Sequence, residues 1–307
     1  MFRRRPAHQR TQLSHRQINR LLPFTNAPLF HALQLLATGD SARFHMPGHK
    51  GEPLFNTFSE VFSIDFTETY GTGNLYLGDG PIRDAEVAAA RYFDAADCFF
   101  LTGGSTQGIL AMLATAVGRG GAVLLDRECH KSVCHACALL DITPYFMTAP
   151  LIEPFGISGG LPPAEAERQL IDHPEIRAVF LTSPTYYGIR RAIPAFADLC
   201  RAYGKVLLVD VAHGAHFPAG LPTPIAEGAD YAALSMHKTL PCLGQGAVLL
   251  TGKGVDKGAL RENTALFGTS SPSYPIMASI DLARAYVEGP GRTAYHRAAE
   301  ACGELRE

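Results

Sequence analysis

The sequence predicts an α/β protein with a mostly parallel sheet that helices cover on both faces. Three observations predict it. Short apolar or β-branched runs recur from residue 98 to residue 252, and segments with helical spacing separate most of them. Strand, crossover and strand repeated this often are typical of parallel sheets. A hydrophobic content of 47% and a charged content of 18% over 307 residues allow a sizeable core.

The expected elements follow in chain order. The predicted strands are CFFLT (98–102), AVLLD (122–126), TPYFMT (143–148), AVFLTS (178–183), KVLLVDVA (205–212), YAALSM (231–236) and GAVLLTG (246–252). The predicted helices between them are 107–117, 131–140, 164–171 and 193–203. Ligands of such sheets lie beyond the carboxyl ends of the strands, so we expect the chemistry in the loops that follow the runs.

The remaining segments are placed around this sheet. Residues 1–40 are predicted to form a basic tail and a helix, and residues 41–275 the major domain. The segment 39–83 is loop-like and dense in Gly, Pro, His and aromatic residues, which predicts an ordered active-site or interface segment rather than a linker. Residues 276–307 are predicted to begin a set of helices. The chain looks cut short, because a helical pattern is still running at its end.

Charge and hydropathy narrow the class of partner. The formal net charge is -2 and the sequence pI is about 6.6, so we expect neither nucleic acid nor an anionic membrane surface as partner. No run reaches about 18 apolar residues, and the basic first twenty residues lack a following signal-peptide core. A small molecule or another protein is the expected partner.

The cysteines predict a reduced, cytoplasmic chain. There are seven of them, an odd number, scattered through apolar or helical stretches. Cys134 and Cys137 form a single C-x-x-C pair, which a redox or metal site would also contain. Without a second pair, thiols that pack a helix are the better interpretation, and we predict no metal site.

The first group of candidate residues is Gly103-Gly104-Ser105-Thr106-Gln107-Gly108, between a predicted strand and a predicted helix. Glycines allow close backbone approach, hydroxyls donate hydrogen bonds, and a helix start offers free N–H groups. The pattern is neither G-x-G-x-x-G nor a Walker A sequence, so a different phosphate is expected. A tight turn with a Ser or Thr N-cap is the alternative.

The second group is the strand end that leads from Asp210 to His213 and Gly214. A buried carboxylate needs a cation, and a protonated pyridine nitrogen is one. An Asp that caps a turn, or that binds a metal with His213 and His216, is the alternative.

The third group is Ser235-Met236-His237-Lys238-Thr239, which ends an apolar run. A lysine in such a place can form an imine with an aldehyde, and Ser235 and His237 can reach a phosphate. A lysine that snorkels from a strand end is the alternative. The order of the three groups favours the functional interpretation, because together they would hold one ring at its phosphate, its pyridine nitrogen and its aldehyde.

Ordered motifs extend this pattern over most of the chain. They are FHMPGHKG (44–51), GDGPIRDAE (78–86), LTGGSTQG (101–108), DRECHKS (126–132), TSPTYYG (182–188), DVAHGAH (210–216) and SMHKTLP (235–241). With these motifs the chain resembles the fold-type-I pyridoxal-phosphate-dependent ornithine/lysine/arginine decarboxylases in their shorter bacterial form, from about Phe44 to about Pro275. The resemblance implies the large-domain fold of pyridoxal-phosphate-dependent transferases.

The resemblance also implies residue roles. Lys238 looks like the Schiff-base lysine, Asp210 like the partner of the pyridine nitrogen, and His130 like the imidazole that stacks on the ring. His130 at a helix N-terminus is the simpler alternative. The residues similar in place to the phosphate ligands are Ser105, Thr106, Ser235 and His237. His213 is expected to face the ring or its phenolic oxygen.

The implied reaction is loss of CO2 from the α-carbon of a basic amino acid, with the ring as electron sink and Lys238 or a histidine returning a proton. A homo-oligomer is also implied. His45, His49 and Lys50 either stabilise their loop or lie near the substrate or a subunit interface.

Two departures from the family pattern keep alternatives open. Val211 stands where the family commonly has an acidic residue, and the family's smaller C-terminal domain is absent from this sequence. An inactive cofactor-binding homologue that pairs with a fuller subunit is therefore one alternative. Another fold-type-I activity, such as aminotransfer or carbon–sulfur lyase chemistry, is the second, and the motifs SMHKTLP and HMPGHKG argue against it. No motif selects among arginine, lysine and ornithine.

Overall fold

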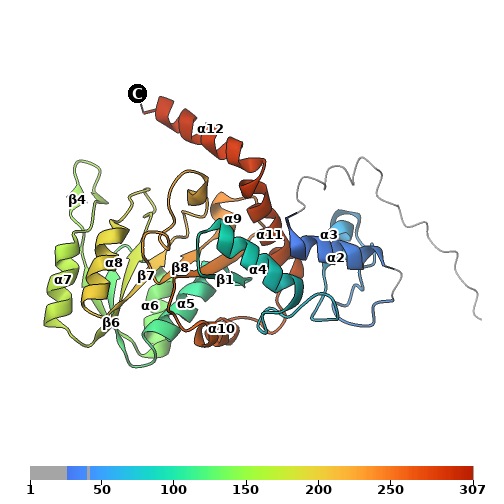
Figure 1. Ribbon diagram of the computed structural model, residues 1–307, viewed down its shortest axis with the longest axis horizontal. Coiled ribbons are helices and arrows are strands. Elements are labelled where there is room, and N and C mark those ends of the chain that lie inside the picture. The colour runs from blue at the N-terminus through green and yellow to red at the C-terminus, as the bar shows by residue number, and fades with distance from the viewer. Residues whose placement is uncertain (1–25, 40–41, 307) are drawn as a thin grey trace, which may run out of the picture.

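A computed structural model describes residues 26–39 and 42–306. Its centre is a seven-stranded sheet with the strand order β1-β9-β8-β7-β6-β2-β3 (Figure 1). The strands are β1 Asp97–Leu101, β2 Ala122–Asp126, β3 Thr143–Met147, β6 Ile176–Thr182, β7 Val206–Asp210, β8 Tyr231–Leu234 and β9 Ala247–Thr251. Each of the seven predicted runs has become one of these strands.

Parallel pairing dominates the sheet. The pairs β2–β3, β2–β6, β6–β7 and β7–β8 are parallel, whereas β9 is antiparallel to both β1 and β8. The predicted α/β fold with a mostly parallel sheet is thereby confirmed. Because the five neighbouring strands β8, β7, β6, β2 and β3 point the same way, the residues that follow them gather at one edge of the sheet.

Helices cover both faces of this sheet (Figure 1). The helices of the described chain are α2 Pro28–Thr38, α3 Ser59–Ile64, α4 Gly80–Tyr92, α5 Gly104–Ala116, α6 Lys131–Leu140, α7 Pro163–Asp172, α8 Ile193–Ala202, α9 Met236–Thr239, α10 Lys257–Leu266, α11 Tyr274–Glu288 and α12 Gly291–Glu304, of which α12 projects away from the sheet. Side chains cap several of them: Asp256 accepts from the N–H of Ala259 at the start of α10, and Ser273 from that of Ile276 at the start of α11.

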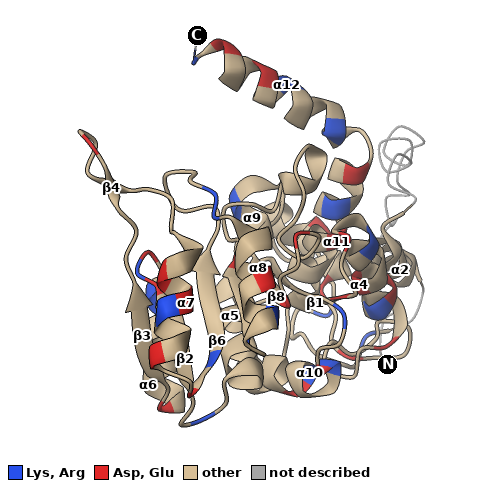
Figure 2. Ribbon diagram, turned by 60° about the vertical axis from the view of Figure 1, so that its left-hand side comes forward, with Lys and Arg blue, Asp and Glu red and all other residues tan. Residues whose placement is uncertain are grey.

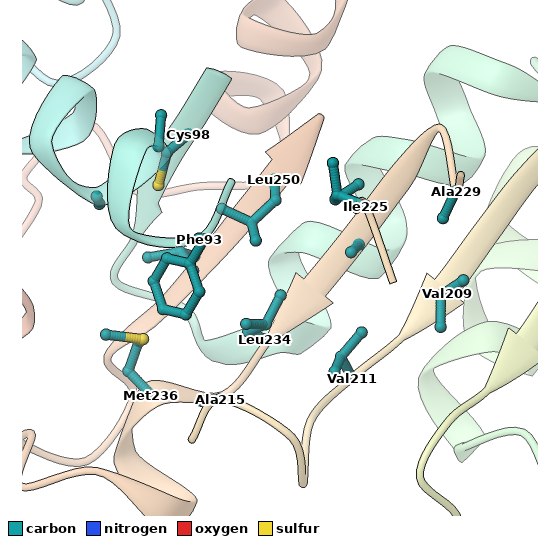
Figure 3. Close-up of a cluster of buried hydrophobic side chains, with 14 of the residues drawn as sticks. Phe93, Cys98, Val209, Val211, Ala215, Ile225, Ala229, Leu234, Met236 and Leu250 are labelled. Atoms are coloured by element: carbon teal, nitrogen blue, oxygen red, sulfur yellow. The ribbon is translucent and has the colours of Figure 1, made fainter. Parts of the chain in front are cut away.

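Two buried apolar clusters lie on opposite faces of the sheet. One contains Ile109 of α5, Val133 of α6 and Leu260 of α10, and the other contains buried residues of α2, α4, α7, α8 and α11. Val209 and Val211 point into the second cluster (Figure 3). Because strand side chains alternate, Asp210 between them points to the α5 face.

The structure adds elements that the sequence pattern did not indicate. The segment 39–83, expected to be loop-like, contains the short helices η2 Asn56–Phe58 and α3 and the first residues of α4. A small hairpin of β4 Leu151–Ile152 and β5 Ile157–Ser158 stands beside the main sheet, too short to give a strand signal.

The ends of the chain are described only in part. The basic tail up to residue 25 lies outside the described residues, and the predicted N-terminal helix is α2. Helix α12 stands out from the body in both views, and charges of both signs are interspersed along α7, α10 and α12 (Figures 1 and 2). In the described ranges we find no helix long and apolar enough to cross a membrane. The domain boundaries and the cytoplasmic location stay predictions.

Candidate active site

A pocket of about 390 Å³ lies at the carboxyl ends of the parallel strands, over the start of α5. All eight residues predicted as site residues line it. They are Ser105, Thr106, His130, Asp210, His213, Ser235, His237 and Lys238. The structure thus brings together side chains that are up to 133 residues apart in the sequence (105 to 238).

The predicted phosphate cradle forms one end of this pocket. Gly104 has a φ of +71°, which favours glycine, and its N–H donates to the carbonyl of Gln245 at 2.9 Å. The hydroxyl of Ser235 donates to that of Ser105 at 2.9 Å. Helix α5 begins without a side-chain cap, so the alternative of a Ser or Thr N-cap is wrong. The start of a thirteen-residue helix therefore faces the pocket with its N–H groups.

Asp210 lies at the floor of the pocket, at the end of β7. It is 3% exposed, and the N–H of Ala212 donates to its Oδ1 at 2.9 Å. Among the described residues it forms no ion pair within 4.0 Å. Burial raises the pKa of Asp210 to about 6, against the opposing effects of the Ala212 N–H and the charge of Lys238. A buried carboxylate in this state needs a cation.

Lys238 lies on the short helix α9, and its Nζ is 3.4 Å from Nε2 of His213. Burial, together with the charge of Lys238, lowers the pKa of His213. The neutral imidazole can therefore share a proton with the amine at neutral pH. The described residues hold no group of three or more His, Cys, Asp or Glu suited to a metal ion, so the metal alternative for Asp210 has no support in the geometry.

His130 lies at a helix N-terminus, as the simpler interpretation expected, and it also lines the pocket, while its stacking on a cofactor ring stays a prediction. It is the N-cap of α6, where its Nδ1 accepts from the N–H of Ser132 at 3.3 Å, and its ring also lines the pocket. Because Nδ1 accepts, the neutral ring carries its proton on Nε2. Burial lowers the pKa of His130, and the nearby Lys238 lowers it further. The cap thus holds a neutral ring at the pocket wall.

Four further polar or aromatic residues line the pocket that we did not predict as site residues: Glu128, Thr182, Tyr186 and Gln245. Thr182 ends β6 beside Asp210 in the parallel register, and its hydroxyl is buried without a hydrogen-bond partner in the described structure. The Tyr186 ring meets that of His213 edge-on at 5.7 Å. The signal that could have found them is their position at the carboxyl end of the predicted strand 178–183, where Thr182 lies near its end and Tyr186 in the loop that follows.

The histidines of the FHMPGHKG motif lie elsewhere and do not line this pocket. His49 stacks on Phe62 at 4.2 Å, and its Nε2 lies 3.2 Å from a carboxylate oxygen of Asp65. Lys50 donates to the carbonyl of His45 at 2.6 Å. These contacts support the loop-stabilising interpretation of the three residues within a single chain.

The fold and the pocket define an α/β protein with three groups in one site: a helix start that can bind a phosphate, a buried carboxylate and a lysine. Such a site suits a small phosphorylated ligand. Comparison with known families makes the assignment specific. The chain belongs to the Orn/Lys/Arg decarboxylase family: the model of its major domain matches residues 27–307. The resemblance read from the seven motifs is thereby confirmed.

Similar proteins include one named as a decarboxylase and one that is uncharacterized. An arginine decarboxylase of Bacillus subtilis (strain 168) is 32% identical over 275 residues, which are 86% of this chain and 56% of that protein. The uncharacterized protein YaaO of the same organism is 36% identical over 273 residues, 86% of this chain and 57% of YaaO. The chain thus spans a little over half the length of these relatives.

The constitutive lysine decarboxylase of Escherichia coli has a similar fold, with a TM-score of 0.80 and 24% sequence identity. The match covers 94% of this chain and 44% of that one. At this identity the likeness concerns the fold alone, and it agrees with the sheet described above.

Proposed function

We propose that this chain decarboxylates a basic amino acid with pyridoxal 5′-phosphate as its cofactor. The observation that carries the proposal is the convergence, in one pocket, of the helix start at Ser105, the buried carboxylate of Asp210 and the amine of Lys238. These groups match the phosphate, the pyridine nitrogen and the aldehyde of the cofactor. Membership of the Orn/Lys/Arg decarboxylase family supports the same reaction.

The pocket fits this cofactor because one of its polar groups lacks an ion-pair partner, and another lacks a hydrogen-bond partner, in the described chain. Asp210 has no ion-pair partner in the described chain, and a protonated ring nitrogen would supply the missing positive charge. The hydroxyl of Thr182, also without a partner there, can hydrogen-bond to a polar group of the ligand. When bound, the cofactor supplies an electron sink for the negative charge left on the α-carbon after CO2 departs.

In this proposal each residue of the site has a separate catalytic or binding role. Lys238 would hold the cofactor covalently until the substrate amine displaces it, and its released Nζ, 3.4 Å from Nε2 of His213, would be placed to return a proton to the α-carbon. The neutral ring of His130 is placed to stack on the cofactor ring. The phosphate ligands are Ser105, Thr106, Ser235 and His237.

Glu128 supports a substrate with a cationic side chain. It lines the pocket from the loop between β2 and α6, and the hydroxyl of Ser158 in the β4–β5 hairpin donates to its Oε1 at 2.9 Å. Asp210 is committed to the ring nitrogen in this proposal, so Glu128 is the pocket carboxylate that can attract the far end of arginine, lysine or ornithine.

A second copy of the chain is the partner we propose. Large apolar side chains between residues 44 and 77 lie exposed, a pattern typical of interaction surfaces. They are Phe44, Met46, Leu54, Phe55, Phe58, Val61, Tyr70 and Leu77. The segment carries the FHMPGHKG motif, so a homo-oligomer would give His45, His49 and Lys50 a place at the interface.

Reductive trapping tests the cofactor assignment. The protein is incubated with pyridoxal phosphate, reduced with borohydride and mapped by peptide mass spectrometry, beside Lys238→Ala and the control Lys131→Ala, which changes a lysine at the start of the neighbouring α6. We expect the label on Lys238 in the wild type and the control, and none at this site in Lys238→Ala. A wild type without label at Lys238 contradicts the assignment.

Release of CO2 from arginine, lysine and ornithine then tests the reaction. Release from at least one of them is expected, with loss in Lys238→Ala. Labelling of Lys238 without CO2 from any of the three would contradict the decarboxylase proposal and favour a cofactor-binding partner subunit. Transfer of the amino group to a ketoacid would indicate aminotransfer instead.

A further inference from the structure

Helix α12 lies beside the segment that carries Lys238: Ala294, Tyr295 and Ala298 line one hollow with Lys238 and Thr239, and Tyr295 makes a hydrogen bond to that segment. Most of the helix is exposed, but Tyr295 is half-buried against the apolar core, and its hydroxyl donates to the carbonyl of Thr239 at 2.6 Å. Thr239 follows Lys238 directly and ends α9. The contact therefore joins the last helix of the chain to the segment that carries the reactive lysine.

The Thr239 carbonyl is a group that needs a partner. Helix α9 has only four residues, and the last carbonyls of any helix have no partner within the helix. The N–H of Leu240 donates back to Met236, which closes the single turn, and the Tyr295 hydroxyl satisfies the carbonyl at its end. One tyrosine hydroxyl from a distant helix thus stabilises the turn on which Lys238 stands.

The same tyrosine contacts the second active-site segment. Its ring stacks on His216, with centroids 6.3 Å apart and planes 14° from parallel. His216 lies three residues beyond His213, in the loop that follows Asp210, and its Nδ1 is buried without a hydrogen-bond partner in the described structure. The ring of Phe217 also meets the imidazole edge-on at 5.3 Å, so two aromatic rings pack against His216.

These contacts place Tyr295 behind the pair formed by Lys238 and His213. The lysine and the histidine come from segments 25 residues apart and meet at 3.4 Å. Tyr295 contacts the residue after the lysine with its hydroxyl, and the histidine three residues after His213 with its ring. A shift of α12 would move both segments together.

We propose that Tyr295 is a positioning residue that sets the distance between the Lys238 amine and His213 from behind the pocket. The role in catalysis rests on the proposed function. Through Tyr295, the placement of α12 governs how well the site holds its cofactor and returns the proton.

Hydrogen exchange of the protein without cofactor tests the structural half of this proposal independently of any reaction. In Tyr295→Phe, which removes only the hydroxyl, we expect faster exchange of the Lys238 and Leu240 amides than in the wild type. Loss of one net hydrogen bond corresponds to a roughly three- to tenfold change. Tyr203→Phe is the matched control, because it removes a hydroxyl that is hydrogen-bonded to Glu167 on a remote surface.

Cofactor binding tests the other half. Titration with pyridoxal phosphate should show weaker binding in Tyr295→Phe, by about the same factor, and unchanged binding in Tyr203→Phe. His216→Ala is the second variant. Because it acts on the same tyrosine, its effect combined with Tyr295→Phe should be less than the product of the two separate effects.

The outcomes separate the two proposals. A wild type that does not bind pyridoxal phosphate contradicts the proposed function, while the exchange result still decides whether Tyr295 orders the lysine segment. Unchanged exchange at Lys238 and Leu240 in Tyr295→Phe, in a variant with wild-type circular dichroism, overturns the positioning role. The positioning role is also overturned if the combined effect of Tyr295→Phe and His216→Ala on cofactor binding equals the product of the two separate effects.

Discussion

Two aspartates end parallel strands at the same edge of the sheet and differ in what surrounds them. Asp126, at the end of β2, receives two hydrogen bonds from Arg191, at 2.8 Å from Nε and 3.2 Å from Nη2, and both side chains are fully buried. Asp210, at the end of β7, is also buried but receives one backbone hydrogen bond and no ion-pair partner among the described residues.

The difference separates a carboxylate that is paired within the chain from one that, in the proposed function, is left to pair with the cofactor. Arg191 also donates to the carbonyl of Gly159, so the Asp126 pair joins the loop after β2 to the chain beyond the β4–β5 hairpin. Its charge is balanced within the chain. Burial raises the pKa of both carboxylates, but at Asp126 the charge and hydrogen bonds of Arg191 oppose the rise, whereas at Asp210 only the Ala212 N–H and the charge of Lys238 do. A strand-end carboxylate without an internal cation is therefore the better guide to a site.

The largest effect is expected from breaking the internally balanced pair. Arg191→Met leaves Asp126 buried and uncompensated, which should lower the free energy of unfolding by about 3–5 kcal/mol in urea titrations. The double variant Asp126→Leu/Arg191→Met should recover much of this loss, since it removes both charges. A single variant within about 1 kcal/mol of the wild type would show that the pair contributes little.

Removing the unpaired charge of Asp210 should raise the free energy of unfolding rather than lower it. The pKa of Asp210 in the folded protein is raised to about 6. The stability that its protonated carboxyl group contributes is therefore fully present below the unfolded pKa near 3.8 and is lost as pH rises through about 6. In the protein without cofactor, Asp210→Asn should therefore gain stability over the wild type as pH rises from 4 to 7, approaching about 3 kcal/mol.

Urea unfolding across this pH range measures the difference, with Asp198→Asn, an exposed carboxylate, as the control. The same Asp210→Asn variant should bind pyridoxal phosphate more weakly, because the counter-charge for the ring nitrogen is gone. A stability difference that does not change between pH 4 and pH 7 would show that burying the ionised Asp210 carboxylate does not destabilise the fold.

Glu128 shares a feature with each of the two aspartates: it takes part in the structural contacts of Asp126, and like Asp210 it lines the pocket. Its N–H donates to Asp126 at 3.1 Å, while its side chain lines the pocket. Glu128→Gln keeps the backbone contact and the Ser158 hydrogen bond but removes the charge, so kcat/KM for a basic amino acid should fall about five- to tenfold, roughly 1 kcal/mol, mainly through KM. Thermal unfolding should stay unchanged. An effect on kcat alone would argue against substrate recognition.

The smallest effect is expected at Thr182, whose hydroxyl has no partner in the described chain. Thr182→Val should leave the unfolding free energy of the protein without cofactor unchanged or higher, and weaken cofactor binding by about 0.5–1 kcal/mol in fluorescence titrations. Thr251→Val is the matched control, because its hydroxyl is also buried without a partner in the described structure but lies outside the pocket. Equal effects of both variants on binding would exclude a ligand role for Thr182.

Much of the fold could be predicted from local pattern. The seven runs correspond to the seven strands of the main sheet. Six of these strands are largely buried, which requires an apolar stretch, whereas β3 lies at the edge of the sheet and is mostly exposed. The β4–β5 hairpin was missed because each of its strands has only two residues, too few to show a period.

By itself the sequence determined the order of the strands along the chain and the positions of Ser105, Asp210 and Lys238 at their ends, since burial and chain direction impose both locally. Only the tertiary structure decided that Asp126 meets a cation 65 residues away and Asp210 does not. It also decided that Thr182 keeps its hydroxyl free within the described chain, and that Tyr295 reaches Thr239. Such pairings depend on which elements pack together, and local sequence carries no record of a distant partner.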